Sequence, residues 1–353
     1  MENRYARLTL EDIAEEIHIS RTTIYKVINN KGTVSDKTRE AVLAALKKYH
    51  YTPNNNARNL AMNRSYVIAL VNYISSDASY FASTIEKGVM QAVESYGDHG
   101  LVINRYTSPV NRPERQITDI ENAYAAGIRH FIISAVDPDL LRPVITDLKA
   151  KDCVVILLSK MIPDAPADAF IGIDDYKSGR LAAQLLGKML PSGGNLQLLV
   201  AKKSLSNYAA TTAKFQGFLD QISASFPDIS LLPILNELDG RKSIDAALTQ
   251  ALKNHRIHGI LDLTYRLDII SDILTREGRT DTLLVGMDLF PEMEHYLACH
   301  TIDAVIFQNL KAQTFLACRL MFEYMCYGQK VEQETYYSKL EIVMGENMEY
   351  FLS

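Results

Sequence analysis

The sequence has 353 residues, of which 47% are apolar and 22% are charged, and its net charge is −5. This composition is typical of a globular protein with room for two or three domains. It excludes a chain of membrane helices, because no apolar run approaches the roughly 18 residues that such a helix needs. The first residues lack the continuous apolar segment of a secretory signal, so we expect a cytoplasmic location.

The spacing of the cysteines and the distribution of charge further limit the classes of protein to which this chain can belong. Cys153, Cys299, Cys318 and Cys326 are scattered and form no C-x-x-C pair, which argues against a zinc site and against a disulfide framework. We expect neither a metal nor a cofactor.

Residues 1–65 contain eleven Lys and Arg against seven Asp and Glu, a net charge of +4, whereas the remainder carries −9. A basic segment joined to an acidic body is compatible with a nucleic-acid partner.

Three short helices are predicted within the first fifty residues. Thr9, Ser20 and Ser35 are the expected N-caps, because each precedes an apolar stripe of helical period. The buried faces are expected at Leu10, Ile13, Ala14 and Ile17, at Ile24, Val27 and Ile28, and at Val42, Ala45, Leu46 and Tyr49. The first two helices are joined by only a few residues, so helix-turn-helix packing is expected.

The second helix carries a polar face opposite its apolar stripe. Arg21, Thr22, Tyr25 and Lys26 lie on that face, near the helix N-terminus, where a recognition helix meets base edges. The alternative is a solvated face on an ordinary three-helix domain. Spacing alone leaves both interpretations open.

The longer segment TLEDIAEEIHISRTTIYKVINNKGTVSDKTREAVLAALKKYHYTPNNNARNLA resembles the head and hinge of the lactose repressor (LacI-type) family. That family's patterns are T-x-x-D-[IV]-A-x-x-x-x-[VI]-S-x-x-T-[VI], V-S-x-x-T-R-x-x-V and Y-x-P-N-x-x-A-R-x-L. All three occur here in register over about fifty residues, which makes the resemblance specific.

The resemblance implies DNA contacts for the matched positions. Arg21 and Thr22 would read major-groove base edges, while Asn29, Thr38 and Asn54 would contact phosphates or sugars. Residues 54–61 would fold into a hinge helix on DNA and insert Leu60 into the minor groove. The alternative for Leu60 is an ordinary apolar contact in a linker helix. The full expected set is Thr9, Ser20, Arg21, Thr22, Tyr25, Lys26, Asn29, Thr38, Asn54, Asn55, Ala57, Arg58 and Leu60.

Three positions depart from the family pattern. His18 stands where the family usually has Gly in the turn, and it is tolerable there if its backbone reaches a positive φ. Tyr25 replaces a common Ser, and Lys26 replaces the usual Arg, a more planar donor. These changes leave DNA binding as the expectation, but they make the operator sequence unpredictable.

From Tyr66 onward, short apolar runs alternate with amphipathic stretches. Strands are predicted at 66–73, 101–104, 130–134, 154–159, 170–173, 196–201, 259–264, 282–287 and 304–308. Such alternation is typical of α/β folds, with parallel sheets covered on both faces. So many strands favour two Rossmann-like lobes over a single sheet.

The body also resembles the periplasmic-binding-protein type that such heads carry. The expected organisation is an all-α helix-turn-helix head at 1–52 and a hinge at 53–65. Lobe 1 is expected at 66–164 with 309–327, and lobe 2 at 165–308 with 328–353. Three crossover segments would join the bilobed body, and a ligand would bind between the lobes at the strand C-termini.

Polar and aromatic residues follow the predicted strands, and the sequence GIDDYKSG is similar to the family's G-x-D-N-x-x-x-G. Carboxylates and amides suit a hydroxyl-rich ligand, and an aromatic face suits sugar C–H groups. Each residue alone could equally be a solvated loop residue or a cap. Lys214 and the Thr264–Tyr265 pair depart from the family pattern, and a lysine could meet a carboxylate or phosphate on a modified sugar. The expected ligand-binding set is Tyr73, Phe81, Ser134, Lys160, Asp174, Lys214, Thr264, Asp288 and Gln308.

The sequence therefore predicts a transcription regulator, usually a repressor in this family, of carbohydrate genes. Its expected partners are a pseudo-palindromic double-stranded DNA operator, a carbohydrate-like effector and a second copy of the chain in a homodimer. A solute-binding protein for sugar uptake is the alternative, although it would have no use for residues 9–61. An enzyme is not expected, because no nucleophile–base pair, metal spacing or dinucleotide fingerprint is present.

Overall fold

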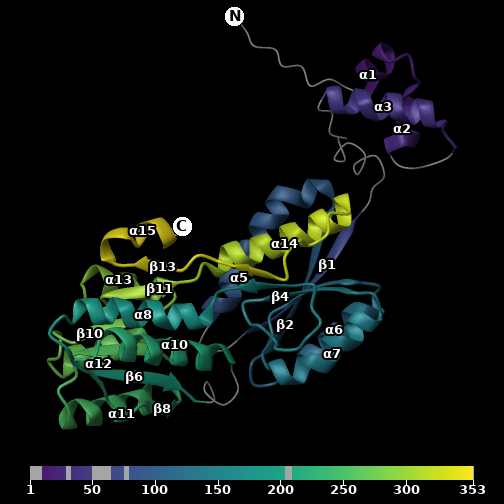
Figure 1. The fold of residues 1–353 in the computed structure, drawn as a ribbon. Coiled ribbons are helices and arrows are strands. Elements are labelled where there is room, and N and C mark those ends of the chain that lie inside the picture. Colours follow the sequence, from purple (N-terminus) through teal and green to yellow (C-terminus); the bar gives the residue numbers. More distant parts are fainter. Residues whose placement is uncertain (1–9, 29–32, 50–64, 75–78, 203–208, 353) are drawn as a thin grey trace, which may run out of the picture. The chain divides into compact units, whose positions relative to one another are not determined.

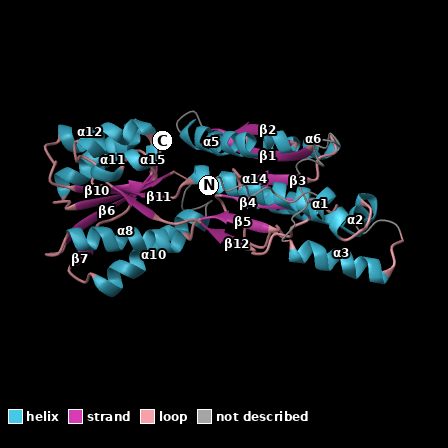
Figure 2. Cartoon of the chain, turned by 90° about the horizontal axis from the view of Figure 1, so that it is seen from above, coloured by secondary structure: helices cyan, strands magenta, loops and turns pink. Residues whose placement is uncertain are grey.

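The structure is a computed structural model that describes residues 10–28, 33–49, 65–74, 79–202 and 209–352. The chain divides into two compact units, Met1–Met62 and Asn63–Ser353, which we call the head and the body. Figure 1 shows the elements along the chain, and Figure 2 separates helices from strands by colour.

Three helices pack around a small apolar core in the head. α1 spans Leu10–Glu16, α2 spans Arg21–Ile28 and α3 spans Asp36–Lys48. The core consists of Ile13, Ile24, Val27, Val42 and Ala45. All five residues belong to the predicted stripes, so the predicted three-helix packing is confirmed.

Two predicted caps and one predicted backbone conformation are confirmed in the head. Ser20 Oγ accepts a hydrogen bond from Thr23 N at 3.2 Å, and Ser35 Oγ accepts one from Thr38 N at 3.2 Å. His18 has a φ of 52°, which lies in the left-handed region where the family's glycine would be unstrained. The predicted cap Thr9 lies outside the described residues.

The body contains two sheets. The first has the strand order β12-β5-β4-β3-β1-β2, and all its pairs are parallel. Its strands are β1 (Tyr66–Ile74), β2 (Leu101–Pro109), β3 (His130–Ile133), β4 (Val154–Leu158), β5 (Ala169–Gly172) and β12 (Thr335–Tyr337). We call this sheet and the helices that cover it lobe 1. Those helices are α5 (Ser79–Tyr96), α6 (Arg115–Ala125), α7 (Pro138–Ala150) and α14 (Leu310–Tyr327), with the short 3₁₀ helix η1 (Gly97–His99).

The second sheet has the order β13-β11-β10-β9-β6-β7, with β8 also paired to β6 and with β13 antiparallel to β11. Its strands are β6 (Gly194–Ala201), β7 (Ile229–Leu231), β8 (Leu235–Leu238), β9 (Gly259–Leu263), β10 (Leu283–Met287), β11 (Ala304–Phe307) and β13 (Glu341–Val343). This sheet and its helices form lobe 2. The helices are α8 (Asp175–Met189), α10 (Ala209–Ser225), α11 (Gly240–Asn254), α12 (Leu267–Arg276), α13 (Glu294–Ala298) and α15 (Glu349–Leu352), with η2 (Pro291–Met293) and η3 (Gly345–Asn347).

Each sheet is buried on both faces, as its apolar strands require. In β1, Ile68 and Leu70 pack with α5 and α14, whereas Ala69 and Val71 pack with α6 and α7 on the opposite face. Figure 1 shows α5 and α14 running side by side over lobe 1. In lobe 2, α8 and α10 cover one face of the sheet, and α11, α12 and α13 cover the other.

The predicted boundary between the lobes is wrong at two strands. The prediction placed 165–308 and 328–353 in lobe 2, but β5 and β12 are edge strands of the first sheet. β5 pairs in parallel with β4 through Ile156 and Ala169, and β12 pairs with β5 through Thr335 and Phe170. Strands this short carry no sequence signal for the sheet they join, so only the pairing assigns them. β7, β8, β12 and β13 were not among the predicted strands, because none of them is an unbroken apolar run.

Candidate functional site

The ends of several strands bring predicted ligand residues together between the two sheets. Tyr73 lies at the end of β1 and Lys160 follows β4 in lobe 1. Asp288 follows β10 and Gln308 follows β11 in lobe 2. The carboxyl ends of parallel strands are where α/β proteins place their binding clefts. We call the region between these strand ends the cleft.

Asp288 and Gln308 form a buried pair at the lobe 2 side of the cleft. Their exposed fractions are only 2% and 6%, and Gln308 Nε2 donates a hydrogen bond to Asp288 Oδ2. Burial raises the pKa of Asp288 to about 6, although the Gln308 hydrogen bond and the Lys214 cation act in the opposite direction. Two predicted ligand residues therefore hold each other in place by a hydrogen bond at the ends of neighbouring strands.

Lys214 and Asp175 form a second buried pair. The Lys214 ammonium contacts Asp175 Oδ1, and both side chains are largely buried. Two glycines allow α8 and α10 to come this close. A Cβ at Gly179 would collide with the backbone of Lys214, and one at Gly217 would collide with the backbone of Tyr176. The predicted residue Lys214 thus reaches the site because α8 and α10 pack backbone to backbone.

Tyr73 and Lys160 form the lobe 1 side of the cleft. The Lys160 ammonium lies 4.5 Å from the centre of the Tyr73 ring, within cation–π range. Desolvation raises the pKa of Tyr73 to about 12, and the carboxylate of Asp288 contributes in the same direction. Residues from both lobes therefore interact electrostatically across the cleft.

Four rings form a contact across the two lobes, which we call the aromatic bridge. Tyr80 and Phe81 come from the first turn of α5, and Tyr265 and Phe290 follow β9 and β10. The ring centres are 4.1 Å apart for Tyr80 and Phe290 and 5.6 Å apart for Phe81 and Tyr265, with edge-to-face geometry. Such pairs contribute roughly 0.5–1.5 kcal/mol beyond their buried area. Phe81, a predicted ligand residue, belongs to this bridge.

The loop after β9 is held in place by Asp262, which is fully buried. Asp262 Oδ1 accepts hydrogen bonds from Thr264 N at 2.8 Å and from Thr264 Oγ1 at 2.6 Å. Asp262 Oδ2 accepts one from Arg266 N at 3.0 Å. These bonds support the left-handed backbone of Tyr265, whose φ is 61°. The Thr264 hydroxyl is therefore engaged within its own loop, and its contact with a ligand stays a prediction.

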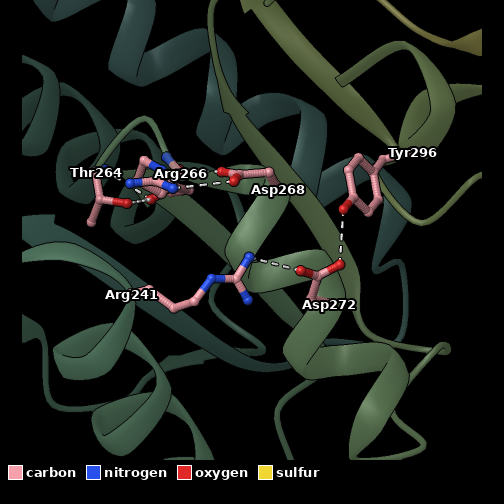
Figure 3. A network of polar contacts seen from close by, with 7 residues as sticks. Arg241, Thr264, Arg266, Asp268, Asp272 and Tyr296 are labelled. Carbon is pink, nitrogen blue, oxygen red and sulfur yellow. Dashed lines mark hydrogen bonds and ion pairs between the residues drawn. The ribbon is translucent and has the colours of Figure 1, made fainter. Parts of the chain in front are cut away.

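Figure 3 shows that this loop continues into a charged network on lobe 2. The guanidinium of Arg266 lies 3.2 Å from the carboxylate of Asp268. One turn further along α12, Asp272 accepts hydrogen bonds from Arg241 at 2.9 Å and from the Tyr296 hydroxyl at 2.8 Å. The contacts of Asp272 tie α11, α12 and α13 together beside the loop.

Two further predicted ligand residues have structural partners. Asp174 caps α8, because its Oδ1 accepts a hydrogen bond from Lys177 N at 2.9 Å and its Oδ2 lies 3.3 Å from Lys177 Nζ. Ser134 is buried after β3, and its carbonyl accepts a hydrogen bond from Gln116 Nε2 at 2.9 Å. Gln116 also accepts one from Val136 N, so it joins the segments at the end of β3. Ligand contacts of Asp174 and Ser134 stay predictions.

The described part of the head presents the predicted polar face of α2. Arg21, Thr22 and Lys26 are exposed, as a DNA-reading surface requires. Arg21 Nη1 pairs with Glu11 Oε1 at 2.8 Å, and both side chains are 64% exposed. The hydroxyls of Ser20 and Thr38 are 2.9 Å from Thr23 Oγ1 and 2.7 Å from Ser35 Oγ, respectively. The predicted contacts that lie outside the described residues are Thr9, Asn29, Asn54, Asn55, Ala57, Arg58, Leu60 and the side chain of Tyr25.

Comparison with protein families decides the identity. Residues 9–54 match the bacterial regulatory proteins of the lacI family, and residues 68–330 match the periplasmic binding protein domain. This chain belongs to the LacI family. The predicted family and fold class, a helix-turn-helix head on a periplasmic-binding-protein-like α/β body, are confirmed.

Named relatives of this LacI-family chain are transcription regulators. The HTH-type transcriptional repressor PurR of Escherichia coli O139:H28 is 45% identical over 78 residues, which are 22% of this chain and 23% of PurR. The HTH-type transcriptional regulator MalR of Streptococcus pneumoniae serotype 4 is 26% identical over 230 residues, which are 63% of this chain and 67% of MalR. The match to PurR thus spans about a quarter of that protein's length.

Solved structures share the fold of the body. A sugar ABC transporter sugar-binding protein from Bacillus halodurans has a TM-score of 0.72 at 19% identity, covering 81% of this chain and 100% of that one. AraP, an arabinose binding protein from Geobacillus stearothermophilus, has a TM-score of 0.70 at 17% identity, covering 82% and 100%. Among the residues described, no helix of this LacI-family protein is long and apolar enough to span a membrane. Within that same set, no three His, Cys, Asp or Glu side chains gather as a metal site would require.

Sequence reasoning missed Asp175, Asp262 and Phe290. A signal existed for Asp175, because it shares the buried stripe of α8 with Ser178, Gly179 and Ala182, whereas Asp174 precedes the helix. Phe290 follows the β10 strand end by three residues, but nothing local shows that it meets Tyr80. Asp262 lies inside a buried strand, where a lone carboxylate predicts only that it has hydrogen-bond partners.

Proposed function

We propose that the protein is a transcription repressor that binds operator DNA through its head and a small effector in the cleft of its body. The observation that carries this proposal is the lacI-family match at residues 9–54, on a packed three-helix head whose α2 exposes Arg21, Thr22 and Lys26. Cations and hydroxyls at the start of an exposed helix are suited to base edges in a major groove. We assign no catalytic step to the chain.

The effector is a carbohydrate or a carbohydrate derivative. The cleft offers the Asp288–Gln308 pair, the Lys214–Asp175 pair and the ring of Tyr73. Carboxylates and amides can accept and donate the paired hydrogen bonds that vicinal hydroxyls need, and aromatic rings can cover their C–H faces. Structures that share the fold are named for binding sugars, which favours the same ligand class. Contacts from Ser134, Asp174 and Thr264 also belong to this proposal. The side chains of Asp174 and Thr264 would first have to leave their present hydrogen-bond partners.

Regulation follows from the two-lobed body. Two chains in a cytoplasmic homodimer would place two heads on a pseudo-palindromic operator, because a two-fold dimer matches a two-fold site. An effector that binds the closed and open lobes with different affinities shifts the equilibrium between them. That shift would alter the spacing of the hinges, residues 53–65, and hence operator affinity.

Gel retardation of DNA from the protein's own promoter tests this function. The full chain should retard the fragment at low salt, and a variant lacking residues 1–61 should not, while the circular dichroism of its body persists. Retardation by the truncated variant would contradict the proposal. A solute-binding protein, the alternative function, would bind sugar in both forms and retard DNA in neither.

The proposed insertion of Leu60 into the minor groove can be tested separately. Leu60→Ala should weaken binding to the operator more than binding to random DNA, because only the specific complex gains from a kinked step. Leu43→Ala, an exposed apolar residue on α3, is the matched control and should leave both affinities unchanged. Equal losses on the two DNAs would identify Leu60 as an ordinary linker contact.

A thermal-shift screen identifies the effector class. Neutral sugars, sugar acids and sugar phosphates are compared, since a ligand that binds only the folded chain raises its melting temperature by mass action. A shift that persists in Asp288→Asn would place the ligand away from the cleft.

A further inference from the structure

A second pocket lies outside the cleft, where the two lobes meet. Its volume is about 290 Å³, and its walls come from α5, the loop after β10, the junction of β11 with α14, and α15. That volume is near the lower end of the range for small-molecule sites, which begins at roughly 300 Å³. Tyr73, Lys160, Lys214, Asp288 and Gln308 are not among the described residues that line it. We call it the outer pocket.

The lining of the outer pocket combines two cations with aromatic rings. Lys87 of α5 and Lys311 of α14 supply the cations, and Tyr80, Phe307 and Phe351 supply the rings. Phe307 and Phe351 pack edge to face at 5.3 Å, which makes one wall apolar. No carboxylate belongs to the described lining of the pocket, although Asp288 and Glu292 lie near enough to raise the pKa of Tyr80. Tyr350, which is 74% exposed, stands in the lining and offers an uncovered aromatic face.

We infer that the outer pocket binds a small organic anion with a flat apolar part, such as an aryl phosphate or aryl carboxylate. The anionic group would lie between Lys87 and Lys311, and the apolar part would lie against Phe307 and Phe351. Ammonium groups suit phosphate and carboxylate as point charges, and aromatic walls bind flat rings by edge and face contacts. A neutral sugar could lay a C–H face against the rings, but it would offer no charge to the two lysines.

The outer pocket can couple to the cleft because it includes both lobes and one residue of the aromatic bridge. α5 and α14 belong to lobe 1, whereas Pro291 and α15 belong to lobe 2. Tyr80 lines the pocket and also meets Phe290 at 4.1 Å in the bridge. The crossover at Asn309 passes along the same wall. A ligand that fits one arrangement of the lobes better than the other would therefore change effector affinity, and the effector would change its affinity equally.

Ligand-observed NMR with phenyl phosphate tests the binding on the full chain, and benzyl alcohol and inorganic phosphate serve as separate probes. Phenyl phosphate should bind with a Kd of about 1 mM, at least tenfold tighter than either other probe. Lys87→Gln and Lys311→Gln should each weaken it severalfold, and Ala312→Trp should fill the pocket and abolish it. Lys253→Gln, which removes an exposed lysine on α11, is the matched control and should have no effect. Asp288→Asn should also leave phenyl phosphate binding unchanged, which separates the outer pocket from the cleft.

Three results would overturn the inference. One is the absence of saturation by phenyl phosphate up to about 10 mM, ten times the expected Kd. Another is a loss of binding in Asp288→Asn as large as in the lysine variants. The third is a change in oligomer mass for a folded Ala312→Trp chain in sedimentation, because that would assign the pocket to a second copy of the protein. The binding test does not depend on the proposed function, whereas the coupling does, because it requires that an effector binds in the cleft.

Discussion

The ring of Tyr80 meets the ring of Phe290 with their centres 4.1 Å apart, so α5 of lobe 1 touches the loop after β10 of lobe 2. Phe81 and Tyr265 repeat the contact at 5.6 Å. The two lobes are therefore joined by ring edges at the place where an effector would have to pass or settle.

Removing the Tyr80 ring should favour the open arrangement of the lobes. A lost edge-to-face contact is worth roughly 0.5–1.5 kcal/mol, so Tyr80→Ala should shift a two-state lobe equilibrium by about twofold to tenfold. Small-angle X-ray scattering should then give a larger radius of gyration in the absence of effector. Tyr80→Phe keeps the ring and should scatter like the unchanged protein. Identical scattering from Tyr80→Ala would mean that the bridge does not hold the lobes together.

The stability cost of Asp288 should depend on pH. Burial raises its pKa to about 6 from 3.8, so the folded chain retains a proton that the unfolded chain has released between these values. The contribution of Asp288 to stability is therefore greatest below about pH 4 and is lost as the pH rises through 6, a change of about 3 kcal/mol for a shift of this size. Asp288→Asn removes this dependence, so its melting temperature relative to the unchanged protein should be higher at pH 7 than at pH 4. Calorimetry across this range checks the sign, and an equal difference at both ends would contradict it.

The Lys214–Asp175 pair should be much more costly to break than to replace. Lys214→Met leaves the Asp175 carboxylate, whose side chain is 15% exposed, without its cation. Breaking a buried pair in this way costs about 3–5 kcal/mol, whereas replacing both partners by apolar residues is often neutral. Urea unfolding should therefore show Lys214→Met well below Lys214→Met/Asp175→Leu in stability. Lys253→Met is the exposed control, and a double variant no more stable than the single one would refute the interpretation.

Glu11 should compete with DNA for Arg21. Their side chains pair at 2.8 Å in the free head, and Arg21 must leave Glu11 to reach a base edge. Exposed pairs of this kind are worth up to about 1 kcal/mol, so Glu11→Gln should tighten operator binding by at most about fivefold. Fluorescence anisotropy measures the change, and Glu40→Gln on the exposed face of α3 controls for the lost negative charge. A gain no larger than that of Glu40→Gln would show that the pair does not restrain Arg21.

The sequence determined the parts of the fold that depend on neighbours along the chain. Ser20 and Ser35 cap α2 and α3 because a hydroxyl beside a helix N-terminus finds its own amides. His18 adopts a positive φ because the tight turn between α1 and α2 requires that backbone conformation of whichever residue occupies the position. Nine strands of the body were predictable, because a parallel sheet buried on both faces needs unbroken apolar runs.

Only the tertiary structure decided which distant segments meet. β5 joins the first sheet through its pairing with β4, although its residues would suit either sheet. Asp175 rather than Asp174 meets Lys214, because Gly179 and Gly217 let α8 approach α10 on that face. Phe290 reaches Tyr80 across some two hundred residues of chain. Capping and turn energies act over a few residues and leave a local pattern, whereas these contacts depend on how whole lobes pack, which no short stretch of sequence encodes.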